Sequence, residues 1–120
     1  MKLSIIIPVY NEEKTIVDII KKVKDVNLDT TRKEIIVVDD GSDDKTVSVL
    51  KNKVEPIVDK VIYKQKNIGK GAAIRTGIEY ASGDYIIFQD ADLEYDPEEY
   101  VKLLKLVIEG WNVITEEIKY

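Results

Sequence analysis

The sequence predicts an α/β fold in which a mostly parallel sheet lies between two layers of helices. Short apolar segments rich in isoleucine and valine alternate along the chain with segments whose apolar residues recur every three or four positions. The first pattern is typical of strands buried on both faces, and the second is typical of amphipathic helices. The length of 120 residues, without a visible linker or repeat, indicates that residues 1–120 form one domain.

The amino-terminal half of the chain predicts two strands, each followed by a helix. Leu3–Val9 is a continuous apolar run with β-branched residues, as expected of a buried strand. Residues 16–23 then carry four apolar side chains at the spacing of one helix face. Glu34–Val38 predicts the second strand, and Val47–Lys51 predicts a short, weak helix after it.

The carboxyl-terminal half repeats this alternation. Ile57–Tyr63 predicts a third strand, and Ala72–Ala81 predicts a helix that begins at a glycine-rich turn. Tyr85–Gln89 predicts a fourth strand. Asp96 precedes a proline and two glutamates, which marks a helix start because Asp caps free amides and Pro fits the first helical position. Val113–Thr115 predicts a fifth strand, whose open edge would favour a homo-oligomer.

The composition excludes several classes of function. Cysteine and histidine are both absent, which excludes disulfides, thiolate zinc sites and Ser-His or Cys-His catalytic pairs. Any bound metal would therefore be a hard ion held by oxygen, such as Mg²⁺, Mn²⁺ or Ca²⁺. The net charge of −5 argues against general nucleic-acid binding. No apolar run reaches the ~18–20 residues of a membrane span and no secretory signal is evident, so we expect a cytoplasmic location.

Charges of opposite sign are concentrated in two neighbouring segments. Residues 60–75 contain basic side chains and no acid, whereas residues 84–99 contain acidic side chains and no base. A phosphorylated substrate bound together with a divalent ion would suit such a pairing of cationic and anionic patches.

Polar residues follow the first two predicted strands at their carboxyl ends, where open parallel sheets bind ligands. Pro8 marks the end of the first strand, and Tyr10 is placed beyond it, where its ring suits stacking on a nucleobase. The alternative is an ordinary turn in which Asn11 caps the first helix. Asp39 and Asp40 end the second strand as adjacent carboxylates, which are costly unless they accept hydrogen bonds or meet a cation.

The acidic residues after the second strand divide into two expected roles. Asp43 and Asp44 are expected to cap the following helix, with Gly41 supplying the turn. Asp39 and Asp40 are then the candidates for function, because a carboxylate there is able to accept from a base N–H or a ribose hydroxyl.

The fourth strand is followed by Asp90, Asp92 and Glu94 at alternate positions, which extended backbone directs to the same side. Clustered carboxylates repel one another, and a divalent cation removes that penalty, so we expect a metal site here. Lys70 lies in the glycine-rich turn and Arg75 lies one helical turn later, where both are candidates to bind phosphate. A structural ion pair between Arg75 and Asp90 is an equal alternative.

In this order, the motifs resemble the nucleotide-sugar-binding half of the family 2 glycosyltransferases. The resemblance spans residues 3 to about 110 and is closest to the polyprenyl-phosphate sugar synthases, such as dolichol-phosphate mannose synthase. It implies a GT-A, Rossmann-like three-layer fold, truncated so that only its amino-terminal half is present. The motifs that carry the resemblance are Ile5–Glu12, Val37–Ser42, Asn67–Gly71 and Asp90–Pro97.

The resemblance implies a reaction and its ligands. The donor would be a UDP-sugar or GDP-sugar, Mg²⁺ or Mn²⁺ would bridge its diphosphate, and inverting transfer would follow to an acceptor such as a polyprenyl phosphate at the cytoplasmic face of a membrane. Glu94 stands where these synthases usually carry Gln, and no catalytic residue is assigned because the acceptor half is not in the sequence. The implied roles are nucleoside binding by Pro8, Tyr10 and Glu12, base or ribose binding by Asp40 with Asp39, metal binding by Asp90 and Asp92, and phosphate binding by Lys70 and Arg75.

Two other classes of function are compatible with parts of this pattern. The first is a nucleotide-sugar-binding domain without transferase activity. The second is a response-regulator receiver, which shares the sheet class, the length and the clustered acids. A receiver carries its acid pair after the first strand, however, as a haloacid-type aspartyl phosphatase does with its Asp-x-Asp. Here the acids follow the second and fourth strands, which disfavours the receiver and the aspartyl phosphatase.

Overall fold

A four-stranded parallel sheet forms the centre of the molecule. The computed structural model describes residues 1–28 and 30–91. The strands are arranged in the order β3-β2-β1-β4, and all three neighbouring pairs are parallel. They are β1 (Lys2–Val9), β2 (Arg32–Asp39), β3 (Lys60–Tyr63) and β4 (Tyr85–Phe88).

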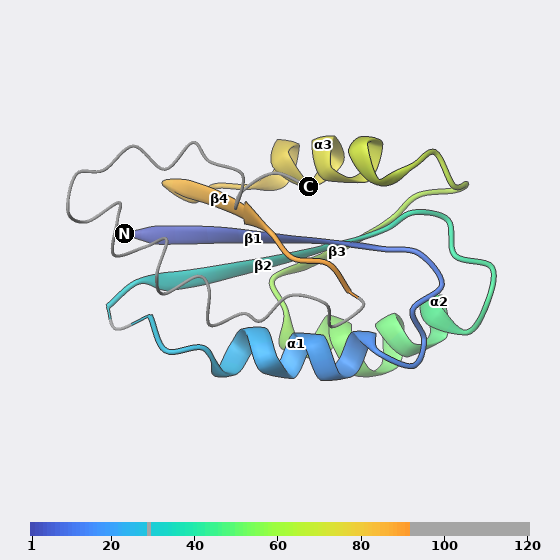
Figure 1. Ribbon diagram of the computed structural model, residues 1–120, viewed down its shortest axis with the longest axis horizontal. Helices are drawn as coiled ribbons and strands as arrows, with labels where there is room; N and C mark the ends of the chain where they lie inside the picture. Colours follow the sequence, from blue (N-terminus) through green and yellow to red (C-terminus); the bar gives the residue numbers. More distant parts are fainter. Residues whose placement is uncertain (29, 92–120) are drawn as a thin grey trace.

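Helices cover both faces of this sheet (Figure 1). α3 (Lys70–Tyr80) lies on one face, whereas α1 (Ile16–Asp25) and α2 (Thr46–Val49) lie on the other. Alternate residues of β1 and β2 point to opposite faces, as strand geometry requires. Ile36 and Val38 pack against Ala73 of α3, and the other core cluster contains Ile5, Ile7, Ile35 and Val37 with Ile16, Ile19, Ile20 and Val23 of α1. The predicted α/β class is confirmed, and the two central strands, β1 and β2, are buried on both faces.

α3 approaches the sheet closely because a glycine faces it. A Cβ atom on Gly77 would lie 2.5 Å from Cγ2 of Ile6, closer than real side-chain contacts permit. Ile6 is fully buried. The missing side chain therefore lets the backbone of α3 lie against the central strand.

At the amino end of the sheet, the carboxylate of Glu34 on β2 binds residues from neighbouring segments. Its Oε1 accepts hydrogen bonds from the Ser4 hydroxyl (2.7 Å) and the Ser82 amide (2.8 Å), and its Oε2 lies 3.2 Å from the Lys2 ammonium. Burial alone would raise the pKa of Glu34, but the hydrogen bonds from Ser82, Ser4 and Lys2 lower that pKa to about 2. One carboxylate thus links β1, β2 and the turn before β4.

The third strand is shorter than the sequence predicts. Ile57–Tyr63 is predicted to be extended throughout, but Glu55–Ile57 forms a 3₁₀ helix and β3 begins only at Lys60. Pro56 lies in the first turn of that helix, where its fixed φ angle and missing N–H are tolerated. The helical segment after β2 is longer than predicted, because a π-helical turn, Leu50–Val54, follows α2.

Two further predicted elements, the helix starting at Asp96 and the strand Val113–Thr115, lie outside the described residues. The prediction of a homo-oligomer through an open sheet edge depended on that strand, so it stays a prediction. Over the ranges 1–28 and 30–91, no helix combines the length and apolarity required to cross a membrane.

Candidate functional site

A pocket lies at the carboxyl ends of β1 and β4, where the topology of the sheet predicts a ligand site. The connection from β1 passes through α1 on one face, whereas the connection into β4 passes through α3 on the other face. Neighbouring strands whose connections lie on opposite faces leave a crevice at their carboxyl ends. The cavity there has a volume of about 280 Å³ and is lined by Pro8, Val9, Tyr10, Glu12, Asp40, Asn67, Gly69, Lys70, Asp90 and Ala91.

β1 and β4 separate before the pocket begins. Their pairing ends at Ile6 and Phe88, whereas β1 stays paired with β2 as far as Val9 and Asp39. The last bond between the two separating strands is from the amide of Gln89 to the carbonyl of Ile6, at 3.0 Å. Pro8 follows this bond, at a position where it removes no donor from the ladder with β4. Residues from both sides of this separation, Pro8 and Val9 on one and Asp90 and Ala91 on the other, line the pocket.

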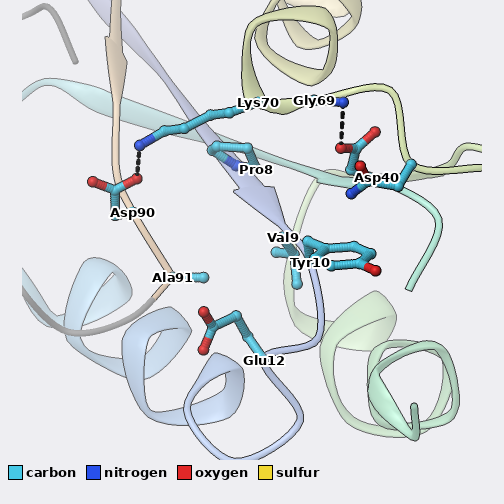
Figure 2. Close-up of a pocket in the computed structure, with 10 residues that line it drawn as sticks. Pro8, Val9, Tyr10, Glu12, Asp40, Gly69, Lys70, Asp90 and Ala91 are labelled. Atoms are coloured by element: carbon cyan, nitrogen blue, oxygen red, sulfur yellow. Dashed lines mark hydrogen bonds and ion pairs between the residues drawn. The ribbon is translucent and has the colours of Figure 1, made fainter. Parts of the chain in front are cut away.

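Asp40 holds the glycine-rich turn against the end of β2 (Figure 2). Its carboxylate accepts a hydrogen bond from the amide of Ile68 on Oδ1 (3.1 Å) and one from the amide of Gly69 on Oδ2 (2.8 Å). Asp40 is 3% exposed and still lines the pocket. Because a carboxylate has about four acceptor positions, it retains the capacity to bind a ligand N–H or hydroxyl.

Gly41 allows the same turn to approach closely. Its φ is +74°, and a Cβ atom there would lie 2.3 Å from the carbonyl carbon of Lys66. Any larger residue would be strained by its backbone conformation and would also displace the segment before Asn67. Gly41 and Asp40 together fix the position of the glycine-rich turn.

A cation and an anion face each other across the pocket. The ammonium of Lys70, the first residue of α3, forms an ion pair with Oδ1 of Asp90, directly after β4 (Figure 2). Gly69, the residue before α3, has no side chain with which to cap the first amides of the helix. A helix start of this kind, beside a lysine, favours a bound anion. Asp90 pairs with Lys70 and not with Arg75, for which this ion pair was one of two alternatives.

Asp90 has the chemistry expected of a ligand for a hard cation. Its carboxylate faces the pocket and already holds one positive charge, the Lys70 ammonium. Within the described part of the chain, no three acidic side chains come together in a metal-binding group. The other two predicted ligands, Asp92 and Glu94, lie outside the described residues.

Two more predicted site residues, Asp39 and Arg75, are not part of the pocket lining. Asp39 is 1% exposed, and its two carboxylate oxygens accept from the hydroxyl (2.6 Å) and the amide (3.2 Å) of Ser42. Arg75 lies on α3 with an exposed side chain. The remaining predicted residues, Pro8, Tyr10, Glu12, Asp40, Lys70 and Asp90, come from separate segments and share one cavity.

Of the three residues expected to cap α1 and α2, one does so. Asp44 accepts from the amide of Thr46 at 2.8 Å, which confirms its predicted role at the start of α2. Asp43 and Asn11 do not cap helices: they bind each other, with the Asn11 amide nitrogen 2.9 Å from Oδ1 of Asp43. Patterns within a short stretch of sequence do not reveal this contact, because it joins two loops that are distant in sequence. The lining residues Asn67 and Ala91 lie within two of the motifs that carry the resemblance, but no role was assigned to either residue.

Comparisons with known proteins agree with this arrangement. The family model described as Glycosyl transferase family 2 matches residues 4–116. An undecaprenyl-phosphate 4-deoxy-4-formamido-L-arabinose transferase of Pseudomonas syringae is 38% identical, over 93% of this chain and 34% of the relative. The uncharacterized glycosyltransferase YkcC of Bacillus subtilis is 36% identical, over 95% of this chain and 36% of its own. The chain thus spans about a third of the length of the curated relatives it matches.

Solved structures show the same fold. Staphylococcus aureus TarS in complex with UDP-GlcNAc superposes with a TM-score of 0.75 at 27% identity, over 91% of this chain and 32% of that protein. The mannosyltransferase PcManGT of Pyrobaculum calidifontis, in complex with GDP-Man and Mn²⁺, gives a TM-score of 0.74 at 24% identity, over 86% and 31%. The chain belongs to glycosyl transferase family 2, and its predicted GT-A fold class is confirmed.

Proposed function

We propose that this family 2 domain binds a nucleotide-diphosphate sugar in the pocket between β1 and β4 and serves as the donor half of an inverting glycosyltransferase. One observation carries the proposal: residues from four separate segments, chosen from the sequence for nucleotide binding, line a single cavity at the switch point of the sheet. Nucleotide-sugar complexes of proteins with the same fold support it.

The pocket offers different chemistry at its two ends. Tyr10, 43% exposed, provides an aromatic face for the base, while Pro8 and Glu12 complete that side of the nucleoside site. Asp40, held beside them, is the proposed acceptor for a base N–H or a ribose hydroxyl. Asp39 would support this site through Ser42 rather than by direct contact.

The diphosphate would lie toward the start of α3. Lys70 and the first amides of the helix favour a bound anion, and Arg75 is the proposed second basic residue. Asp90, with Asp92 and Glu94, would hold Mg²⁺ or Mn²⁺, and this ion supplies charge neutralisation to the diphosphate as it leaves. With the ion held by Asp90, the Lys70 ammonium beside it would be available to the phosphates.

The acceptor and the cellular location follow from the relatives and are proposals for the whole protein. The Pseudomonas syringae relative is named an undecaprenyl-phosphate 4-deoxy-4-formamido-L-arabinose transferase, so a polyprenyl phosphate is the proposed acceptor, and the cytoplasmic face of a membrane is the proposed location. Direct inverting transfer would need no protein nucleophile, and a lipid phosphate, already anionic near neutral pH, would need no general base to attack the sugar.

Calorimetric titration with UDP and with GDP, each in Mn²⁺ and in EDTA, tests the proposal. We expect one of the two nucleotides to bind and its affinity to fall at least tenfold in EDTA. Equal affinity in both buffers would refute the metal-bridged diphosphate, and no binding of either nucleotide would refute the donor site. Binding by the longer protein without sugar transfer to undecaprenyl phosphate would favour the non-catalytic alternative.

A further inference from the structure

Asn11, between two pocket-lining residues, has an unusual backbone conformation. It has a φ of +51°, the one positive value among the described residues other than glycine. Side chains with a Cβ atom rarely adopt this region, and Asn does so more readily than most because its short amide bonds locally. The conformation occurs where the chain leaves β1 and turns toward α1, so it determines how the two flanking side chains are presented.

Hydrogen bonds from the loop after β2 hold this conformation in place. The amide of Asn11 donates to the hydroxyl of Ser42 at 2.9 Å. The side chain of Asn11 then makes a reciprocal pair with Asp43: its Nδ2 donates to Oδ1 of Asp43 (2.9 Å), and its Oδ1 accepts from the amide of Asp43 (3.0 Å). Ser42 is in turn bound to the buried carboxylate of Asp39. These hydrogen bonds therefore connect exposed Asn11 to the buried end of β2.

The flanking residues both line the pocket, whereas Asn11 does not. Figure 2 shows Tyr10 and Glu12 reaching the pocket from the segment after β1. Glu12 is further fixed by the hydroxyl of Thr15, 2.8 Å from its Oε2. Tyr10 is 43% exposed, so packing determines its direction less than the backbone at Asn11 does. A backbone that relaxed at this residue would change the direction of the Tyr10 ring.

We propose that Asn11 is a positioning residue for nucleoside binding, and that its reciprocal pair with Asp43 holds Tyr10 and Glu12 in their ligand-binding orientation. This inference rests on the proposed function, because it assumes that the nucleoside lies against Tyr10. It adds Asn11 and Asp43 to the determinants of binding although neither lines the cavity. Asn suits the position because its amide supplies both the donor and the acceptor of the pair, whereas a carboxylate supplies acceptors alone.

This chemistry permits a test by exchange of the two side chains. In N11D, two carboxylates face each other and the donor to Asp43 is lost. In N11D/D43N, the acceptor at position 11 is retained and the new amide at position 43 supplies the missing donor. N11G provides a neutral variant, since glycine adopts the positive φ without strain but loses both side-chain bonds. N52D is the matched control, because Asn52 is exposed on the turn after α2 and away from the pocket.

The measurement is the dissociation constant of whichever nucleotide, UDP or GDP, binds the unmodified protein in Mn²⁺, with thermal unfolding of each variant recorded in parallel. We expect at least tenfold weaker binding in N11D and about fivefold weaker binding in N11G. N11D/D43N should return to within threefold of the unmodified protein, and N52D should match it. Titration with the uncharged nucleoside should give the same order, which separates positioning from repulsion of the phosphates.

The outcomes separate the two proposals. Absence of nucleotide binding in the unmodified protein refutes the proposed function itself. If the unmodified protein binds but folded N11D and N11G bind equally well, Asn11 does not position the site. If N11D/D43N does not recover nucleotide affinity, the proposed role of the reciprocal pair is refuted. It is also refuted if the loss of affinity in each variant is fully explained by the fraction of that variant that is unfolded.

Discussion

Replacement of Glu34 by Gln should make the unfolding free energy of the domain less dependent on pH in the acidic range. The hydrogen bonds around Glu34 lower its pKa from 4.5 to about 2, and its side chain is 14% exposed in the ion pair with Lys2. A difference of this size corresponds to roughly 3 kcal/mol of stability at neutral pH. Because the pKa is lower in the folded state, this contribution is present above about pH 4.5 and is lost as the pH falls toward 2.

Urea denaturation at neutral and acidic pH measures this contribution. At pH 7, E34Q should unfold with a free energy lower by about 2–3 kcal/mol, since Gln keeps part of the hydrogen bonding. At pH 3, the difference from the unmodified protein should shrink to about 1 kcal/mol. Glu79→Gln, on the exposed side of α3, is the control and should change stability by less than about 0.5 kcal/mol. A gap between E34Q and the unmodified protein that stays constant with pH would refute the reasoning.

Three further substitutions test the site and its support. Gly41→Ala should lower the unfolding free energy by roughly 2–3 kcal/mol, measured by urea denaturation, because of its φ of +74° and the clash with Lys66. Gly77→Ala should cost roughly 1–3 kcal/mol in the same assay, since its Cβ would press on Ile6; an unchanged midpoint would contradict the close packing of α3. Asp92→Asn should weaken Mn²⁺-dependent nucleotide binding about tenfold in calorimetry with little change in thermal midpoint, as expected of a charge-assisted ligand; a collapse of the fold would show a structural role instead.

The sheet and the placement of the site could be predicted because local patterns determine them. Two continuous apolar runs, Leu3–Val9 and Glu34–Val38, indicate central strands, and a parallel sheet brings the carboxyl ends of such strands together. Tyr10, Asp40 and Asp90 could therefore be assigned to one rim before their distances were known, and all three line the pocket.

The features that could not be predicted depend on contacts between segments. Ile57 and Val58 have strand-forming side chains, but they pack against the core without joining the ladder, because the helical turn at Pro56 holds them there. An ion pair between Arg75 and Asp90 was one of two alternatives for Arg75, yet the partner of Asp90 is Lys70, at the start of α3. Helix register and loop direction decide such pairings, and short sequence windows do not contain them.

The segment from Asp39 to Asp43 has a consequence for engineering donor preference. Its side chains bind the turn after β1 through Ser42 and Asp43, and the turn before α3 through Asp40. Neither of these two turns can therefore be redesigned independently of the other. Libraries that keep this five-residue bracket intact and vary Tyr10, Asn67 and Ile68 should retain more folded members than libraries that randomise the bracket itself.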